Sequence, residues 1–233
     1  MRSHPVSMIA FTVLFGTALL AQQAQQAQQP AQPPAPAAGQ QAPAPRRVAS
    51  PAGTAATQVG GQYTKTAPDA PERYTGGKWI EITYGRPILR GRTDIFGTGA
   101  DYGKKVRGAD TLWRAGANNT TRFMTEVPLV FDGKTLPAGE YSLFVDLKPN
   151  AWTLVFSKQP FQAKYDPNNK TETWGATNAD PAQEVLRVPM KVATSPTSMD
   201  QFTIAFVDMT KGGGKLMMWW EKTMATAAFT VGS

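Results

Sequence analysis

Three arginines in one short loop are the residues best suited to binding chemistry. Arg86, Arg90 and Arg92 fall within seven residues of the glycine-rich stretch GRPILRGRTDIFGTG, residues 85–99. A guanidinium group presents five donors in a planar fork that fits a carboxylate or a phosphate. The glycines and Pro87 explain a stiff corner in the chain, but they do not explain three cations.

A second group of suitable side chains follows about twenty residues later. Trp113 and Arg114 are followed by Ala-Gly-Ala and then by Asn118 and Asn119. This combination supplies an apolar ring, a fork of donors, and amides that both donate and accept. We therefore predict a non-catalytic binding module for a carbohydrate or a small anionic ligand. The predicted ligand-binding residues are Arg86, Arg92, Trp113, Arg114 and Asn118.

The same residues allow a purely structural interpretation. The arginines could cap backbone carbonyls or pair with Asp94 or Glu126, and Trp113 could fill the core beneath the loop. The domain would then be an envelope scaffold without a ligand. In that case Arg114→Ala would cost stability and not affinity.

Acidic residues around the same loop suggest a third function. Two carboxylates at a suitable separation can hydrolyse a glycosidic bond, so a carboxylate-based, glycan-directed hydrolase remains an alternative. It requires two acidic groups in one cleft, at least one with a raised pKa. The candidates are Asp94, Asp101, Asp110 and Glu126.

Several other chemistries lack the residues that they need. The chain has no Cys, and its only His is His4, so triads of the Ser-His-Asp type and zinc sites with nitrogen or sulfur ligands are not expected. We expect no cofactor and no metal. Residues 166–172 (DPNNKTE) carry oxygen ligands but lack the spacing of a calcium loop, which favours a turn with local Asx hydrogen bonds.

The N-terminal part predicts export. An apolar run from Met8 to Ala21 follows Arg2 and is too short to span a bilayer comfortably, so residues 1–21 read as a signal peptide and imply a periplasmic or extracellular protein. Residues 22–61 are rich in Gln, Ala and Pro and contain no acidic residue, which predicts a disordered linker. No transmembrane helix is expected after signal cleavage.

The remaining residues, 62–233, are expected to form a single domain with mild charge. Three of the 24 Lys and Arg residues precede residue 62 and none of the 17 Asp and Glu residues do, so this part carries a net charge of +4. So small an excess does not indicate a nucleic-acid partner.

Strand signals dominate this domain. Residues 78–84 alternate in polarity, 121–127 read as a second strand, and Asp132-Gly133 is typical of a tight hairpin. Nine or ten such strands predict an all-β fold, an antiparallel β-sandwich or jelly-roll-like barrel. The long irregular stretches 85–120 and 159–184 are where we expect function to reside.

An ordered series of motifs also resembles a known family. The motifs are ITYGRP (82–87), GRTDIFG (91–97), YGK (102–104), WRAGAN (113–118), LPAGEYSLF (136–144) and WG (174–175). Over residues 65–233 the chain is similar to the exported bacterial family called domain of unknown function 2911, although its segment 104–113 is longer than in the shorter members. The resemblance implies an exported β-rich domain and transfers no catalytic residue.

Overall fold

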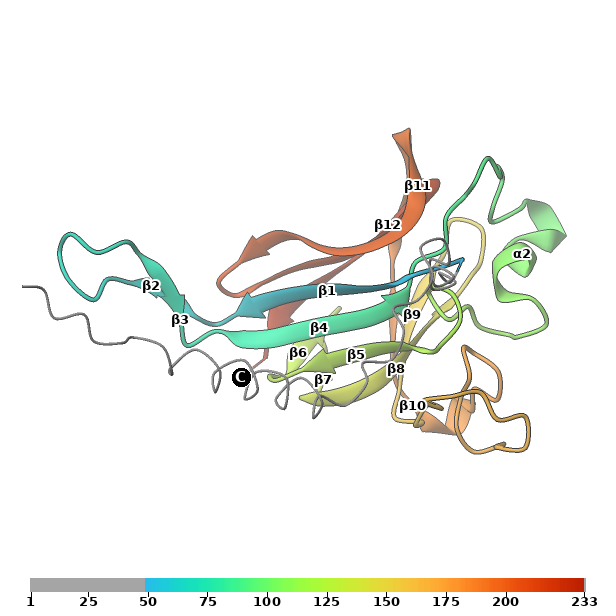
Figure 1. Ribbon diagram of the computed structural model, residues 1–233, viewed down its shortest axis with the longest axis horizontal. Helices are drawn as coiled ribbons and strands as arrows, with labels where there is room; N and C mark the ends of the chain where they lie inside the picture. The colour runs from blue at the N-terminus through green and yellow to red at the C-terminus, as the bar shows by residue number, and fades with distance from the viewer. Residues whose placement is uncertain (1–48, 233) are drawn as a thin grey trace, which may run out of the picture. The chain divides into compact units, whose positions relative to one another are not determined.

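The computed structural model describes residues 49–232, which fall within one compact unit, Arg47–Ser233 (Figure 1). The expected signal peptide and the first part of the expected linker lie outside the described residues. Within residues 49–232 no helix is long and apolar enough to cross a membrane.

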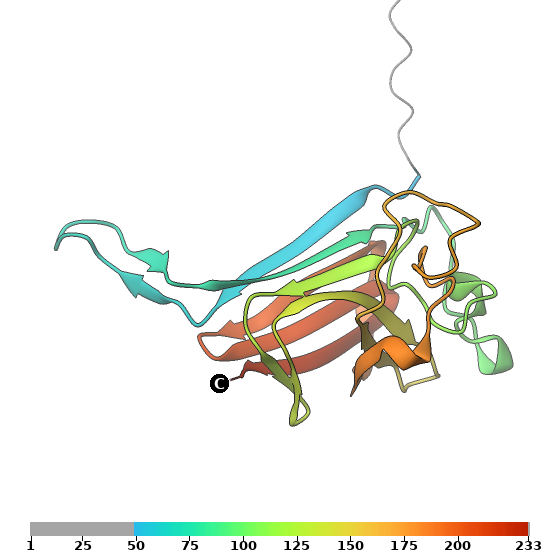
Figure 2. The same ribbon diagram turned by 90° about the horizontal axis from the view of Figure 1, so that it is seen from below.

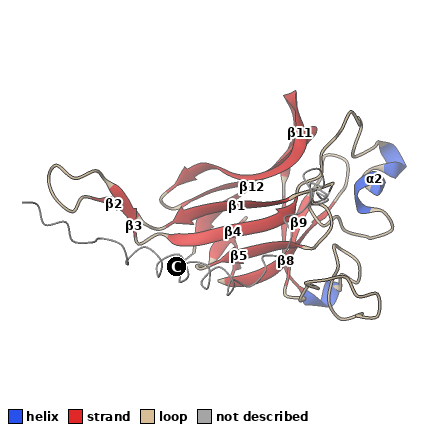
Figure 3. Ribbon diagram, in the orientation of Figure 1, coloured by secondary structure: helices blue, strands red, loops and turns tan. Residues whose placement is uncertain are grey.

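The described domain is built from antiparallel sheets, which confirms the predicted all-β class (Figure 3). The first sheet has the order β1 (Ala52–Val59), β4 (Lys78–Gly85), β5 (Thr121–Thr125), β8 (Gly139–Asp146), β9 (Thr153–Ser157) and β10 (Glu184–Pro189). The second has the order β11 (Lys191–Thr210), β12 (Gly213–Val231), β6 (Leu129–Phe131) and β7 (Lys134–Leu136). Strands β2 (Gln62–Thr64) and β3 (Arg73–Thr75) form a separate hairpin.

The core lies between the two larger sheets. In β4 the alternation predicted from the sequence holds, because Ile80 and Ile82 are fully buried whereas Trp79 is 45% exposed. Leu216 and Met218 of β12 belong to the same buried cluster. Figure 2 shows the red strands of the second sheet as a layer beside the blue and green strands of the first. The sandwich is therefore stabilised by apolar side chains of both layers.

The folded domain begins earlier than residue 61, where the sequence predicts the end of the linker. Strand β1 pairs with β4 over its whole length, from Ala52 opposite Gly85 to Val59 opposite Lys78. The side chains of β1 are small, so the sequence does not indicate a strand that contributes to the core. In the structure only Ala55 and Val59 of this strand are buried. Backbone hydrogen bonds to β4 stabilise β1, because its side chains bury little apolar surface.

The hairpin of β11 and β12 is longer than predicted. The sequence indicates separate strands at 215–222 and 225–231, whereas β12 runs through both. Glu221 has a φ of 53° within β12, and the pairing register with β11 shifts beside it. This bulge lets one strand continue through a local bend. The predicted Asp132-Gly133 turn is confirmed, with φ values of 48° and 73° between β6 and β7.

Candidate functional site

The long connection between β4 and β5 folds over one end of the sandwich (Figure 1). It contains a short 3-10 turn, η1 (Gly99–Asp101), and one helical turn, α2 (Lys104–Arg107). Its first part is fixed to β11, since Leu89 N donates to Asp200 O at 2.8 Å. Its last part is fixed to β8 through Trp113, which exchanges two 2.8 Å backbone hydrogen bonds with Val145.

Trp113 belongs to the core and is not an exposed platform. Its relative exposure is 0%, so the interpretation of this ring as a stacking surface for a sugar is wrong. The indole packs within a group of aromatic rings whose centroids lie 5.0–6.4 Å from its own. These rings belong to Phe96, Trp152, Phe202 and Trp220. Loop residues therefore share one core with both sheets.

The Trp113 indole nitrogen has an unusual environment. Within the part of the chain that the structure describes, Nε1 is the one buried side-chain nitrogen or oxygen without a hydrogen-bond partner. The other indole groups of this cluster are satisfied, since Trp152 Nε1 donates to Tyr102 Oη at 2.8 Å and Trp220 Nε1 donates to Asp200 O at 3.3 Å. A buried donor without an acceptor is destabilising by about 1–3 kcal/mol.

Arg86 lies apart from the other predicted residues. Its Nε is 3.4 Å from Phe202 O, and its Nη2 donates to Thr203 Oγ1 at 3.3 Å. The aliphatic part of the side chain covers Gly53, where any Cβ would meet Arg86 Cδ at 2.2 Å. Arg86 therefore links β1 to β11, which is a structural role.

Arg92 caps its own loop and faces the aromatic cluster. Its Nε donates to Leu89 O at 3.0 Å and its Nη2 to Ile88 O at 2.8 Å. The guanidinium carbon also lies 6.0 Å from the centroid of the Trp220 ring. Arg90, the third loop arginine, is exposed and donates to Ala49 O at 3.1 Å. The three arginines of the motif thus have three different surroundings.

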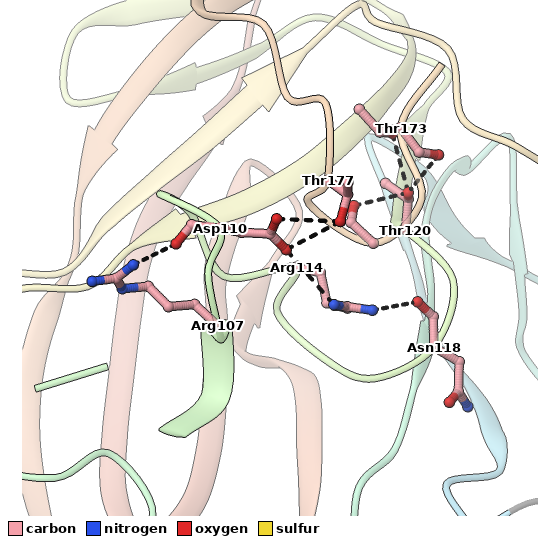
Figure 4. A network of polar contacts seen from close by, with 8 residues as sticks. Arg107, Asp110, Arg114, Asn118, Thr120, Thr173 and Thr177 are labelled. Carbon is pink, nitrogen blue, oxygen red and sulfur yellow. Dashed lines mark hydrogen bonds and ion pairs between the residues drawn. The ribbon is translucent and has the colours of Figure 1, made fainter. Parts of the chain in front are cut away.

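Arg114 lies between Asp110 and Asn118 (Figure 4). Its side chain is 23% exposed, its Nη1 donates to Asn118 O at 2.7 Å, and its Nη2 lies 3.8 Å from Asp110 Oδ2. Burial lowers the pKa of Arg114, and the attraction of Asp110 offsets this only in part. Asp110 also accepts from Thr177 Oγ1 at 3.2 Å. The guanidinium is thus desolvated with little compensating negative charge.

Asn118 closes the loop with a left-handed backbone. Its φ is 64°, and its Nδ2 donates to Ser50 O at 3.0 Å, just before β1. Ala115, two residues after Trp113, also has a positive φ of 49°. For alanine this conformation is strained, and such strain persists only where the surroundings enforce it.

Four of the five predicted residues line one cavity of about 270 Å³: Arg92, Trp113, Arg114 and Asn118. Lys105 and Trp220 also line the cavity and were not among the predicted ligand-binding residues. The Lys105 Nζ lies 2.9 Å from Asp94 Oδ2 and approaches the cavity from α2. The sequence feature that could have indicated Lys105 is the pair of adjacent lysines, Lys104 and Lys105, in the middle of the loop. No acidic residue is among the described residues that line this cavity.

Glu221 anchors the part of the loop that contributes Ile95 to the cavity. Its two carboxylate oxygens accept hydrogen bonds from Asp94 N at 2.8 Å and from Ile95 N at 3.0 Å. Ile95 lines the cavity. The strained Glu221 of β12 is therefore an anchor for the loop between β4 and β5.

Replacing Glu221 with glutamine should loosen this anchor. A neutral amide has one acceptor oxygen in place of two, so one of the two loop amides loses a charge-assisted partner. We expect the exchange of the Asp94 and Ile95 amide protons to become about fivefold faster, which corresponds to a local loss of about 1 kcal/mol. Hydrogen exchange followed by NMR measures this. Asp208→Asn is the control, because that carboxylate pairs with Lys215 elsewhere on the hairpin, and equal exchange in both variants would refute the anchor.

The four candidate carboxylates do not form a pair. Each is engaged separately: Asp94 with Lys105, Asp101 with Lys104, Asp110 with Arg114, and Glu126 with the Trp79 backbone N–H. Lys104 holds the pKa of Asp101 below its usual value, which is the opposite of what a general acid needs. None of these four carboxylates is therefore engaged with the second carboxylate that a two-carboxylate hydrolase requires.

The 166–172 segment forms the local turns expected from its Asp and Asn residues. Asp166 Oδ1 accepts from Asn168 N at 2.9 Å, and Asn169 Oδ1 accepts from Thr171 N and Glu172 N at 3.1 Å. Within the described ranges no cluster of three or more His, Cys, Asp or Glu side chains could hold a metal ion.

Comparison with known proteins agrees with the motif series. A family model described as "Protein of unknown function (DUF2911)" matches residues 67–229. The comparisons with curated proteins and with solved structures found no match.

Proposed function

This chain belongs to the DUF2911 family, whose members have no known function, and from the geometry of its loop cavity we propose that it is a non-catalytic binding module for a small anionic ligand. A carboxylate or another small oxyanion fits best. The expected signal peptide would place this cavity outside the cytoplasm, facing ligands of the envelope or the surroundings.

The charge of the cavity supports an anion. Arg92, Lys105 and Arg114 all line it, and no carboxylate is among its described lining residues, although Asp94 pairs with Lys105 and Asp110 lies near Arg114 outside the lining. A cleft lined by one sign of charge within a low-dielectric wall concentrates counter-ions. The partly buried Arg114 would gain most, because an anion would restore the solvation that burial has removed.

The observation that carries the proposal is the Trp113 indole N–H, which is buried without an acceptor and belongs to a residue that lines the cavity. Proteins rarely leave such a donor unpaired, and a bound ion is one of the explanations for a donor of this kind. A bound oxyanion would accept this hydrogen bond and meet the cations at the same time. This would turn a destabilising feature of the empty protein into binding free energy.

The size of the cavity favours a small ligand. Its volume of about 270 Å³ lies just below the roughly 300–1,000 Å³ of clefts that hold drug-sized ligands. That volume suits a short dicarboxylate or an inorganic oxyanion, whereas an oligosaccharide chain needs more room. The sequence predicts a carbohydrate or a small anionic ligand. For this cavity we therefore retain the small anionic ligand.

Two neighbouring lysines provide a matched test. Lys105 lines the cavity, whereas Lys104 pairs with Asp101 and does not line it. We expect succinate or sulfate to bind to the full chain, and Lys105→Gln to weaken binding about tenfold, since it removes one charge-assisted partner. Lys104→Gln makes the same change in net charge and should leave the affinity unaltered. Titration calorimetry at constant ionic strength measures both.

A scaffold domain without a ligand is the second candidate. The observation in its favour is that Arg86 and Arg92 already donate to main-chain carbonyls, as a structural role requires. It would be supported if succinate and sulfate failed to bind. It would also be supported if both lysine variants weakened binding equally, because this would show attraction by net charge without a site.

A further inference from the structure

At the opposite end of β4 the hairpin of β2 and β3 extends beyond β1 and β4 (Figure 1). Residues at this end line a second cleft. Its volume is about 620 Å³. Its lining includes three aromatic side chains, two glutamines and one charged side chain, which are Tyr63, Tyr74, Trp79, Gln58, Gln62 and Lys211.

Two of these aromatic rings are unusually open to solvent. Tyr63 is 69% exposed and Trp79 is 45% exposed, and only Tyr165 and Val185 among the other large apolar side chains of the described residues are comparably open. Large rings left in water on a concave surface are typical of a binding surface.

The backbone holds the rings in a fixed arrangement. Tyr63 is paired with Tyr74 across β2 and β3, and their centroids lie 5.3 Å apart in edge-to-face contact. Tyr74 Oη accepts from Gly61 N at 2.9 Å. The Tyr74 ring also lies directly over Gly61 and Gly77, where a Cβ would come within 2.5 Å of it. Glycine is required at both positions for the ring to lie there.

Trp79 is oriented by the main sheet. It is paired with Gln58 across β1 and β4, so the amide and the indole lie side by side on one face. The backbone N–H of Trp79 donates to Glu126 Oε2 at 2.7 Å. The hairpin base is in turn tied to the second sheet, because Gly60 N donates to Lys211 O at 3.1 Å. Because these contacts already hold the side chains of the cleft, less conformational entropy is lost when a ligand binds.

The polar groups of this cleft indicate a neutral ligand. Apart from Lys211, its described side chains are aromatic rings, amides, a hydroxyl and a thioether, and none is a carboxylate. A pyranose with equatorial substituents has a flat face of C–H groups that stacks on Trp or Tyr, and a rim of hydroxyls that amides can both donate to and accept from. We infer that this cleft binds a neutral oligosaccharide of hexopyranose units.

This sugar site is separate from the anion cavity. Trp79 lies at the start of β4 and Pro87, which lines the anion cavity, lies just past its end. At about 3.3 Å per residue, the eight steps from Trp79 to Pro87 correspond to about 26 Å. The inference therefore does not depend on the proposed function, and either can fail without the other.

The test is titration calorimetry of the full chain with cellohexaose, mannohexaose and chitohexaose. We expect at least one to bind, and Trp79→Ala and Tyr63→Ala each to weaken that binding about tenfold through loss of ring stacking. Both rings are exposed, so both variants should keep the circular dichroism spectrum and the unfolding midpoint of the parent. The matched control is Tyr165→Ala, which removes a ring of 55% exposure from another loop.

Three results would overturn the inference. The first is that none of the three hexasaccharides binds. The second is that binding survives both Trp79→Ala and Tyr63→Ala. The third is that binding is lost in Lys105→Gln but not in Trp79→Ala, because the sugar would then occupy the anion cavity.

Discussion

Trp113→Ala should lower the free energy of unfolding by about 3–5 kcal/mol. The indole is fully buried and contacts aromatic side chains from the loop, from β11 and from β12. Truncation to alanine removes these contacts and leaves a cavity that the paired backbone around it cannot close. Urea unfolding followed by circular dichroism measures the change.

Trp79→Ala is the matched control for this experiment. It removes the same side chain from a position that is 45% exposed, so we expect a change of no more than about 1 kcal/mol. A small effect at Trp113, similar to that at Trp79, would show that the loop is not part of the core. The assignment of Trp113 to the aromatic cluster would then be wrong.

Gly85→Ala should reduce both stability and anion affinity. A Cβ at residue 85 would lie 1.9 Å from Ala117 O, which is a backbone atom and cannot rotate away. The loop that carries Ala117 and Asn118 must therefore shift, and both residues line the anion cavity. We expect a loss of about 1–3 kcal/mol in the free energy of unfolding, together with weaker binding of succinate. Urea unfolding and calorimetry on the same preparation measure the two effects.

Gly212→Ala tests whether this effect is specific. No atom lies within 4 Å of where its Cβ would be, so we expect it to leave both quantities nearly unchanged. If Gly85→Ala behaved like Gly212→Ala, the close approach of β4 to the 113–118 segment would not exist in the protein. The described cavity would then have a different wall.

The strands with local signals could be predicted from the sequence. The alternation of residues 78–84 follows from one buried and one exposed face, and Asp132-Gly133 supplies the positive φ values that a tight hairpin needs. Strand β1 has no such signal, because its small side chains gain their place through pairing with β4. The β-propensity of these residues did not predict the strand, because pairing with β4 outweighs local propensity.

The site could be predicted only in part. The sequence indicated the loop between β4 and β5, and four of the five predicted residues line one cavity. It could not show that Arg86 is directed to β11, or that Lys105 and Trp220 join the cavity, because these contacts connect segments far apart in the chain. The burial of Trp113 likewise depends on Val145 of β8, which no local pattern reveals.

The most direct test of the anion-binding proposal is the indole ¹⁵N–¹H resonance of Trp113, assigned with Trp113→Phe and followed by NMR during titration with succinate. We expect this resonance to move downfield and to saturate, because its N–H gains an acceptor, while the resonance of the distant Trp79 stays in place. A Trp113 resonance that does not move, or that moves only in step with Trp79, would contradict the account.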